Sequence, residues 1–262
     1  MTEPLLRVAN LSKRFGALVA TDDLTLDVMQ GEMHALIGPN GAGKTTLIGQ
    51  LTGELRPNEG TISFAGRDIT ALSVDARARL GLARSFQITS VFDSFTAEGN
   101  VSLSVQARQP NSFKFWTPAR TIARLRQPAQ DKLTAVGLRG RNADIAADLS
   151  HGEHRQLELA MALATEPKML LLDEPMAGLG LQESRAMSEL LRRLKSQFTI
   201  LLVEHDMDVV FSLADRISVL VGGRIIASGT PDEIRTNPDV RYAYLGEDSE
   251  DLVEETESDV AH

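Results

Sequence analysis

The chain has 262 residues, of which 42% are hydrophobic, so it can bury the core of one large α/β domain or of two smaller ones. It contains no cysteine, which excludes a disulfide framework, a thiolate nucleophile and zinc–thiolate or iron–sulfur sites. The formal net charge is −9, but eight acidic residues with no Lys or Arg among them follow Leu245. The body of the chain is therefore close to neutral, and we expect no nucleic-acid partner.

The first sixty or so residues predict short strands. Leu6–Val8 and Leu24–Val28 alternate apolar and polar side chains, His34–Ile37 is a short apolar run, and Thr61–Phe64 follows a Pro-Asn-Glu-Gly turn signal. No stretch reaches the roughly 18 to 20 consecutive apolar residues that span a bilayer, and the N-terminus lacks the pattern of an export signal. If the protein acts at a membrane, we expect it to dock on a partner that spans the membrane.

The middle of the chain has a different amino-acid composition. From Ser73 to about Gly137 the sequence is rich in Ala, Arg, Gln and Leu at helical spacing, which predicts a mostly helical insertion. After Asp144, helices alternate with the continuous apolar runs Met169–Leu172 and Phe198–Val203. This order indicates a parallel sheet that is covered on both faces.

The end of the chain predicts a hairpin and then an acidic tail. Ile217–Val221 and Ile225–Ala227 flank a Gly-Gly pair, which is a two-residue hairpin signal, and Gly229-Thr230-Pro231 precedes a short helix. Residues 247–262 are acidic and poor in aromatic side chains, so we predict that they are disordered.

A glycine-rich segment follows the strand predicted at His34–Ile37 and precedes a helix. It matches the pattern GxxxxGK[ST], in which backbone N–H groups and a helix N-terminus converge on phosphate oxygens. Lys44 is expected to reach the β- and γ-phosphates, and Thr45 to ligate magnesium. The nucleotide-binding residues expected here are Gly38, Pro39, Asn40, Gly41, Ala42, Gly43, Lys44, Thr45 and Thr46.

A second pair of candidate residues follows the apolar run that ends at Leu172. Asp173 and Glu174 stand at the carboxyl end of this predicted strand, where doubly wound sheets bind their ligands. We expect Asp173 to face the same crevice as Lys44 and to serve as a magnesium partner, directly or through water. Glu174 is placed to polarise an attacking water as the general base of γ-phosphate hydrolysis.

Other segments carry a family resemblance. Leu149-Ser150-His151-Gly152-Glu153 resembles the signature sequence LSGGQ of ABC-type ATPases. The resemblance extends to Phe15, where the family stacks an aromatic ring on adenine, to Gln87 of the Q-loop, and to His205, the switch histidine. It implies a catalytic set of Glu174, His205, Gln87 and Lys44, a magnesium set of Thr45, Gln87 and Asp173, and further nucleotide contacts from Phe15, Ser150 and Gly152.

The resemblance also implies an architecture and an assembly. The fold would be an α/β P-loop NTPase core, a RecA-like mixed sheet with an antiparallel β subdomain, plus a helical ABC-specific subdomain. Residues 1–87 and 161–230 would form the nucleotide-binding core, 88–160 the helical subdomain with the signature, and 231–246 a C-terminal helix, together one domain over 1–246. A second anion site at Ser150 and Gly152 suggests a second nucleotide, so that two ATP molecules bridge a dimer.

The expected partners follow from that assembly. They are transmembrane permease subunits, a second copy or a related ATP-binding subunit, and indirectly a solute-binding protein, with the chain on the cytoplasmic face of the membrane. Segments 13–20, 83–87 and 229–246 resemble the branched-chain amino acid importer group, which includes relatives for urea and amides. His151, Glu153 and Gly180 depart from the commonest family residues, which leaves open how the signature side of the dimer is tuned.

Two alternatives remain open from the residues alone. One is a soluble ABC-type ATPase with a non-transport role, although Lys44 and Ser150 are too close in the chain for the long coiled-coil insertion of DNA-acting relatives. The other is a nucleotide-binding subunit that does not hydrolyse ATP, which Glu174 and His205 argue against.

Overall fold

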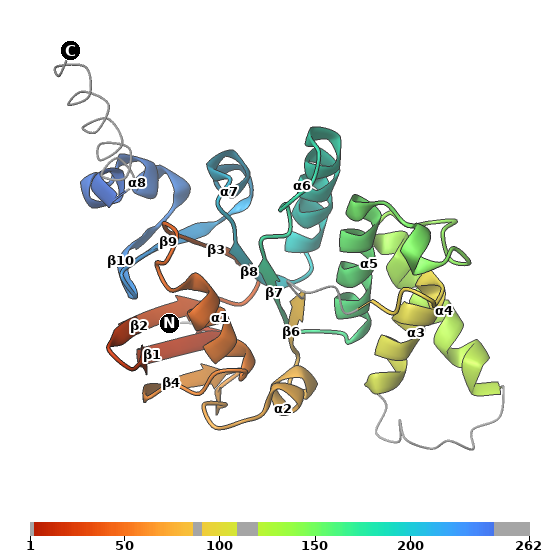
Figure 1. The fold of residues 1–262 in the computed structure, drawn as a ribbon, viewed down its shortest axis with the longest axis horizontal. Coiled ribbons are helices and arrows are strands. Elements are labelled where there is room, and N and C mark those ends of the chain that lie inside the picture. Colours follow the sequence, from red (N-terminus) through yellow and green to blue (C-terminus); the bar gives the residue numbers. More distant parts are fainter. Residues whose placement is uncertain (1–2, 86–90, 109–119, 244–262) are drawn as a thin grey trace, which may run out of the picture. The chain divides into compact units, whose positions relative to one another are not determined.

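The structure, a computed structural model, describes residues 3–85, 91–108 and 120–243 (Figure 1). The chain forms two compact units. Of the described residues, the first contains 3–71 and 205–243, and the second contains 72–85, 91–108 and 120–204.

The first unit contains an antiparallel sheet of four strands in the order β2-β1-β4-β5. Its strands are β1 (Leu6–Phe15), β2 (Leu18–Val28), β4 (Glu59–Phe64) and β5 (Arg67–Asp68). The alternation that predicted the first two strands is confirmed by burial, since Leu6, Val8, Leu24 and Val28 are fully buried. Both strands are longer than the clearest alternation in the sequence, because they pair with each other up to Phe15 and Leu18.

The first unit also contains a small mixed group of strands together with helices. Strand β3 (Met33–Ile37) pairs in parallel with β9 (Arg216–Val221), and β9 forms a hairpin with β10 (Arg224–Gly229), as predicted. The helices are α1 (Lys44–Thr52), α7 (Met207–Leu213) and α8 (Pro231–Thr236). A buried cluster with members on β3, β9, α7 and α8 includes Ile37, Val210, Ile217, Val219 and Ile234.

The second unit combines three parallel strands with helices. Strand β7 (Met169–Asp173) pairs with both β8 (Thr199–Val203) and β6 (Leu82–Ser85). Every residue of β7 and β8 is buried, as continuous apolar runs predict. Helices α2 (Val74–Arg79) and α6 (Leu181–Lys195) belong to the same unit.

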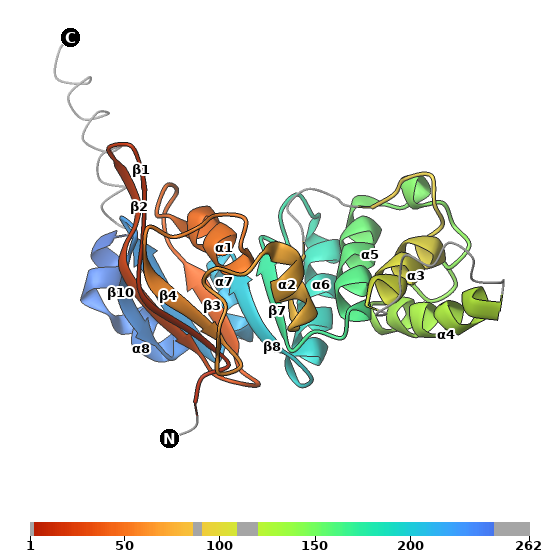
Figure 2. The same ribbon diagram turned by 90° about the horizontal axis from the view of Figure 1, so that it is seen from below.

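Three further helices of this unit pack side by side, as Figures 1 and 2 both show. They are α3 (Ala97–Ala107), α4 (Arg120–Ala135) and α5 (His151–Ala164), and a short 3₁₀ turn (Ala146–Asp148) precedes α5. Buried Val101, Leu133 and Leu157 lie one on each helix. The predicted helical character of this stretch is confirmed.

One element inside the predicted helical block is a strand. Residues Leu82–Ser85 form β6, which pairs in parallel with β7 from Leu82 opposite Met169 to Ser85 opposite Leu172. No strand is predicted there, because four residues are too short to show a periodicity. Their partner strand lies far along the chain, so local propensity is overridden by tertiary pairing.

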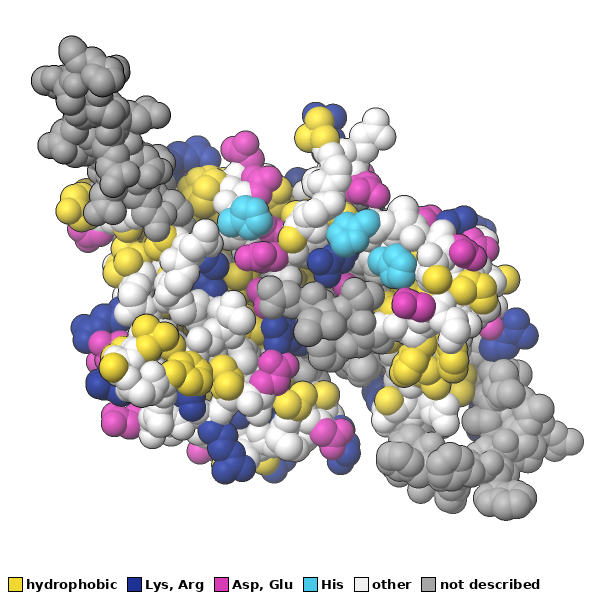
Figure 3. All heavy atoms as spheres, in the orientation of Figure 1, with side chains coloured by type: hydrophobic (Ala, Val, Ile, Leu, Met, Phe, Trp, Pro, Cys, Tyr) yellow, Lys and Arg dark blue, Asp and Glu magenta, His cyan; other side chains and the backbone are white. Residues whose placement is uncertain are grey.

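One face of the described residues mixes charges of both signs. On the face shown in Figure 3, Lys and Arg side chains (dark blue) are interspersed with Asp and Glu side chains (magenta). Within the described residues, none of the helices has the length and apolar character required to cross a bilayer.

Candidate functional site

The phosphate-binding loop connects the buried strand β3 to helix α1. The Lys44 ammonium donates to the carbonyl oxygens of Gly38, at 2.5 Å, and Pro39, at 3.0 Å. The loop is also held to the turn between β9 and β10, because the Gly223 N–H donates to the Ala42 carbonyl at 2.9 Å. The loop is thus wrapped around the lysine side chain, in the strand, loop and helix context that the sequence predicts.

The start of α1 differs from the starts of α5 and α8. Its N-cap is Gly43, which makes no side-chain capping hydrogen bond, and the first turn contains no acidic residue. Helices α5 and α8, in contrast, begin with complete capping boxes. Since the first N–H groups of a helix need acceptors and the helix dipole favours negative charge, this start suits a phosphate group. Thr45 is exposed there and Thr46 is partly exposed.

Two more predicted residues belong to the first unit. Phe15 ends strand β1 with 46% of its surface exposed, and Lys13 lies over the ring at 5.2 Å from its centroid. An exposed ring of this kind is available for stacking on a planar base. His205 is exposed and immediately precedes Asp206, the N-cap of α7, whose carboxylate accepts the N–H groups of Asp208 and Val209.

Asp173 is the last residue of β7 and is 6% exposed. Its carboxylate accepts a hydrogen bond from the Arg84 guanidinium on β6 at 2.9 Å, and both side chains are largely buried. The sequence does not point to Arg84 as part of this site. Its only signal in the sequence is a cationic residue within a short apolar segment, and that segment is not predicted to be a strand.

Glu174 follows directly, with a φ of 48°, in the left-handed region that non-glycine residues rarely adopt. Its N–H donates to the Val203 carbonyl at 2.9 Å, which ties the turn to the end of β8. Such strain is a common property of functional positions. The next turn is fixed by the buried Glu204 carboxylate, which accepts the Met176 N–H at 2.9 Å. No role for Glu204 is predicted from the sequence, although an acid directly after a buried strand is a usable signal.

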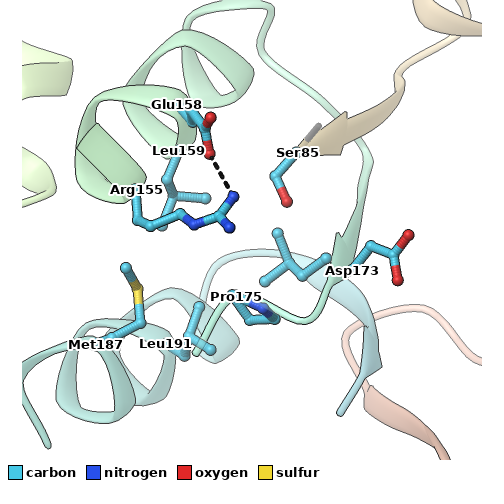
Figure 4. A pocket seen from close by; sticks show the side chains of 9 residues that line it. Ser85, Arg155, Glu158, Leu159, Asp173, Pro175, Met187 and Leu191 are labelled. Carbon is cyan, nitrogen blue, oxygen red and sulfur yellow. Dashed lines mark hydrogen bonds and ion pairs between the residues drawn. The ribbon is translucent and has the colours of Figure 1, made fainter. Parts of the chain in front are cut away.

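A small pocket lies beside this strand end (Figure 4). Arg155 and Glu158, both on α5, form an ion pair at 3.1 Å, and Figure 4 shows the Asp173 carboxylate turned away from that pair. The lining residues are Ser85, Arg155, Glu158, Leu159, Leu172, Asp173, Pro175, Met187 and Leu191.

The signature segment forms the start of α5. Ser150 is the N-cap, and its hydroxyl accepts the Glu153 N–H at 3.2 Å while its own N–H donates to the Glu153 carboxylate at 2.8 Å. Glu153, where the family commonly has Gln, therefore completes a capping box. Burial tends to raise the pKa of Glu153, but the bonds from Ser150 and the nearby Arg141 outweigh burial and lower it.

The predicted residues fall into two groups. Phe15, Lys44, Thr45 and His205 belong to the first unit, and Asp173, Glu174, Ser150 and Gly152 belong to the second. Gln87 lies outside the described residues, as do residues 247–262 of the predicted acidic tail.

Comparisons with known proteins place these features in a family. The family model described as ABC transporter matches residues 21–177, and the model described as branched-chain amino acid ATP-binding cassette transporter matches residues 224–250. The high-affinity branched-chain amino acid transport ATP-binding protein LivG of Salmonella typhimurium is 41% identical over 255 residues, which are 94% of this chain and 100% of LivG. The corresponding protein BraF of Pseudomonas aeruginosa is 39% identical over 254 residues, with the same two coverages.

The fold agrees with solved structures of the same kind. A crystal structure of an ATP-binding cassette of an ABC transporter in its ADP conformation superimposes with a TM-score of 0.82. It is 31% identical and covers 94% of this chain and 100% of its own. The expected α/β P-loop fold with a helical subdomain is therefore confirmed, and the chain belongs to the ABC transporter family, as one of its ATP-binding cassettes.

Proposed function

We propose that this chain is the ATP-binding and ATP-hydrolysing subunit that powers an ABC importer for branched-chain or other amino acids. The observation that carries the ATPase assignment is the phosphate-binding loop, with Lys44 held at its centre and an uncapped helix start beside it. The amino-acid assignment is supported by the printed functions of LivG and BraF and by the match over residues 224–250.

The individual roles follow from the chemistry of each residue. Loop amides and Lys44 bind the phosphates, and the exposed Phe15 ring stacks on adenine. Glu174 accepts a proton from the attacking water, and His205, assisted by Gln87, orients the γ-phosphate.

Magnesium fits the donor set of the proposal. The Thr45 hydroxyl, the Asp173 carboxylate and the Gln87 side chain all offer oxygen, which this hard cation prefers. The ion would neutralise negative charge on the β- and γ-phosphates when bound. The Arg84 guanidinium pairs with the Asp173 carboxylate at 2.9 Å and so fixes its position at the end of β7.

The active form in this proposal is a pair of cassettes. Ser150 and Gly152 receive the γ-phosphate of the ATP held by the loop of the partner, which is a second copy or a related subunit. Hydrolysis opens the pair, and the motion is passed to permease subunits in the membrane, with the chain bound at their cytoplasmic face. A solute-binding protein would deliver the amino acid to the permease.

The Glu174→Gln variant tests the hydrolytic role. We expect ATP turnover to fall by at least about a hundredfold, because a general base contributes 10²- to 10⁴-fold, while ATP binding persists and an ATP-bound pair accumulates. Phosphate release measures turnover, and sedimentation velocity measures pairing.

The matched control is Glu189→Gln, which removes an exposed acid from α6. It should retain the turnover of the unchanged chain. Turnover of Glu174→Gln equal to that of this control would eliminate Glu174 as the base.

Gene deletion tests the solute assignment. We expect loss of high-affinity leucine uptake, restored by the unchanged gene and not by Lys44→Ala. Normal leucine uptake in the deletion strain would refute the branched-chain part of the assignment while leaving the ATPase assignment intact.

A further inference from the structure

The start of α5 is in direct contact with the segment that links Glu174 to α6. The His151 ring lies 3.3 Å from the Ala177 carbonyl oxygen through Nε2. A Cβ added at Gly178 would come within 3.1 Å of the same nitrogen, so the ring packs closely against this backbone.

A second contact in the same place involves Glu183, in the first turn of α6. One carboxylate oxygen accepts the Gly180 N–H at 3.1 Å, and this bond caps α6. The other oxygen accepts the Gly152 N–H at the start of α5, at 3.3 Å. Capping α6 needs only the first of these bonds. The second joins the starts of two helices through one carboxylate.

The surroundings of Gly152 are shaped by that carboxylate. A Cβ at this position would lie 2.7 Å from the nearer Glu183 oxygen, so the carboxylate would have to shift if another residue replaced this glycine. The function proposed above assigns the Gly152 N–H to a phosphate oxygen of the partner's ATP. That N–H has a single hydrogen, and an anion already accepts it. A phosphate arriving there would also meet the negative charge of Glu183 at short range.

We propose that Glu183 is a positioning residue that competes with the partner's nucleotide for the Gly152 N–H. Its carboxylate acts as an internal anion on the signature site, and the γ-phosphate displaces it when the pair closes. Glu183 therefore raises the ATP concentration at which pairing occurs. Two contacts hold the segment after Glu174, namely the His151 ring on Ala177 and the Glu183 bond to Gly152. Displacement of Glu183 breaks the second contact, so nucleotide binding at the signature changes how this segment is held. The inference rests on the proposed function.

The test compares ATP-driven pairing in two double variants, Glu174→Gln/Glu183→Gln and Glu174→Gln/Glu189→Gln. Glutamine at 183 can still accept the Gly180 N–H and so keep α6 capped, but it removes the charge that faces the signature. Both substitutions remove one acid from α6, so net charge is matched. MgATP is titrated, with a related cassette subunit added if the chain pairs with one, and sedimentation velocity reports the fraction paired.

We expect the Glu183 variant to reach half-maximal pairing at an ATP concentration on the order of tenfold below the control, as removal of a neighbouring charge predicts. In the unpaired chain, amide exchange at Gly152, resolved by NMR, should become several-fold faster in Glu183→Gln and remain unchanged in Glu189→Gln. Equal thermal unfolding midpoints for the two variants would exclude a general loss of structure.

An ATP requirement equal to the control would overturn the competition. A higher ATP concentration for half-maximal pairing would also overturn it, because Glu183 would then support the conformation of the signature that binds nucleotide. A failure of the proposed function looks different: the Glu174→Gln parent would not pair at any ATP concentration. The proposed competition would then be refuted together with the proposed function. Amide exchange would still show whether Glu183 accepts the Gly152 N–H.

Discussion

Two glycines of the phosphate-binding loop are needed for different reasons at the level of single residues. Gly41 and Gly43 both have positive φ, at 77° and 108°. A Cβ at Gly41 would meet nothing within 4 Å, whereas a Cβ at Gly43 would lie 2.3 Å from the Ala20 carbonyl oxygen. Gly41 is therefore required by conformation alone, and Gly43 by conformation and by the close approach of β2.

We predict that Gly43→Ala lowers the free energy of unfolding more than Gly41→Ala does. A left-handed conformation costs a non-glycine residue about 1–2 kcal/mol, which is the expected loss for Gly41→Ala. Gly43→Ala adds a backbone clash and should cost roughly 3–5 kcal/mol in total. Urea unfolding measures both variants, with Gly41→Ala as the matched control. Equal losses would show that the loop moves away from Ala20 without cost.

At the scale of elements, the capping boxes at α5 and α8 link helix stability to pH. At α8, the Thr230 N–H and hydroxyl lower the pKa of Glu233. At α5, the Ser150 and Arg141 bonds lower the pKa of Glu153 against the effect of burial. A carboxyl group whose pKa is lower in the folded state stabilises the fold above its unfolded pKa, and this stability is lost as the pH falls through the folded pKa.

We predict that Glu153→Gln reduces the acid sensitivity of the fold. Glutamine can complete the same capping box but does not titrate. Below about pH 4.3, the ordinary pKa of a glutamate, the unchanged chain should lose more stability than the variant. Urea unfolding at neutral and acidic pH measures the difference, with Glu189→Gln as the control. Parallel pH profiles for the unchanged chain and Glu153→Gln would contradict the assignment.

At the scale of the whole molecule, charge is distributed unevenly along the sequence. Removing residues 247–262 removes eight acids and changes the formal net charge from −9 to −1. We predict that the shortened chain is less soluble near neutral pH, because net charge close to zero favours association. ATP turnover should be unchanged, since every described strand and helix precedes residue 247.

Solubility as a function of pH measures this effect. A full-length chain with the eight acids changed to Asn or Gln separates charge from chain length, and it should behave like the shortened chain. If it keeps the original solubility, the charge argument fails.

Structure with local causes could be predicted from the amino-acid pattern. The apolar run before Gly38, the glycines and Lys44 lie within a few residues, so their pattern predicted strand, loop and helix together. The same holds for the apolar run that ends at Asp173 and for the serine that starts α5.

Contacts between segments that are distant in the sequence could not be predicted in this way. Strand β6 exists because β7 lies beside it, and the Arg84–Asp173 pair joins residues 89 positions apart. Glu183 and Gly152 are 31 positions apart on two helices whose starts meet. Periodicity and propensity describe how a segment folds along its own axis, whereas these contacts depend on which segments pack together.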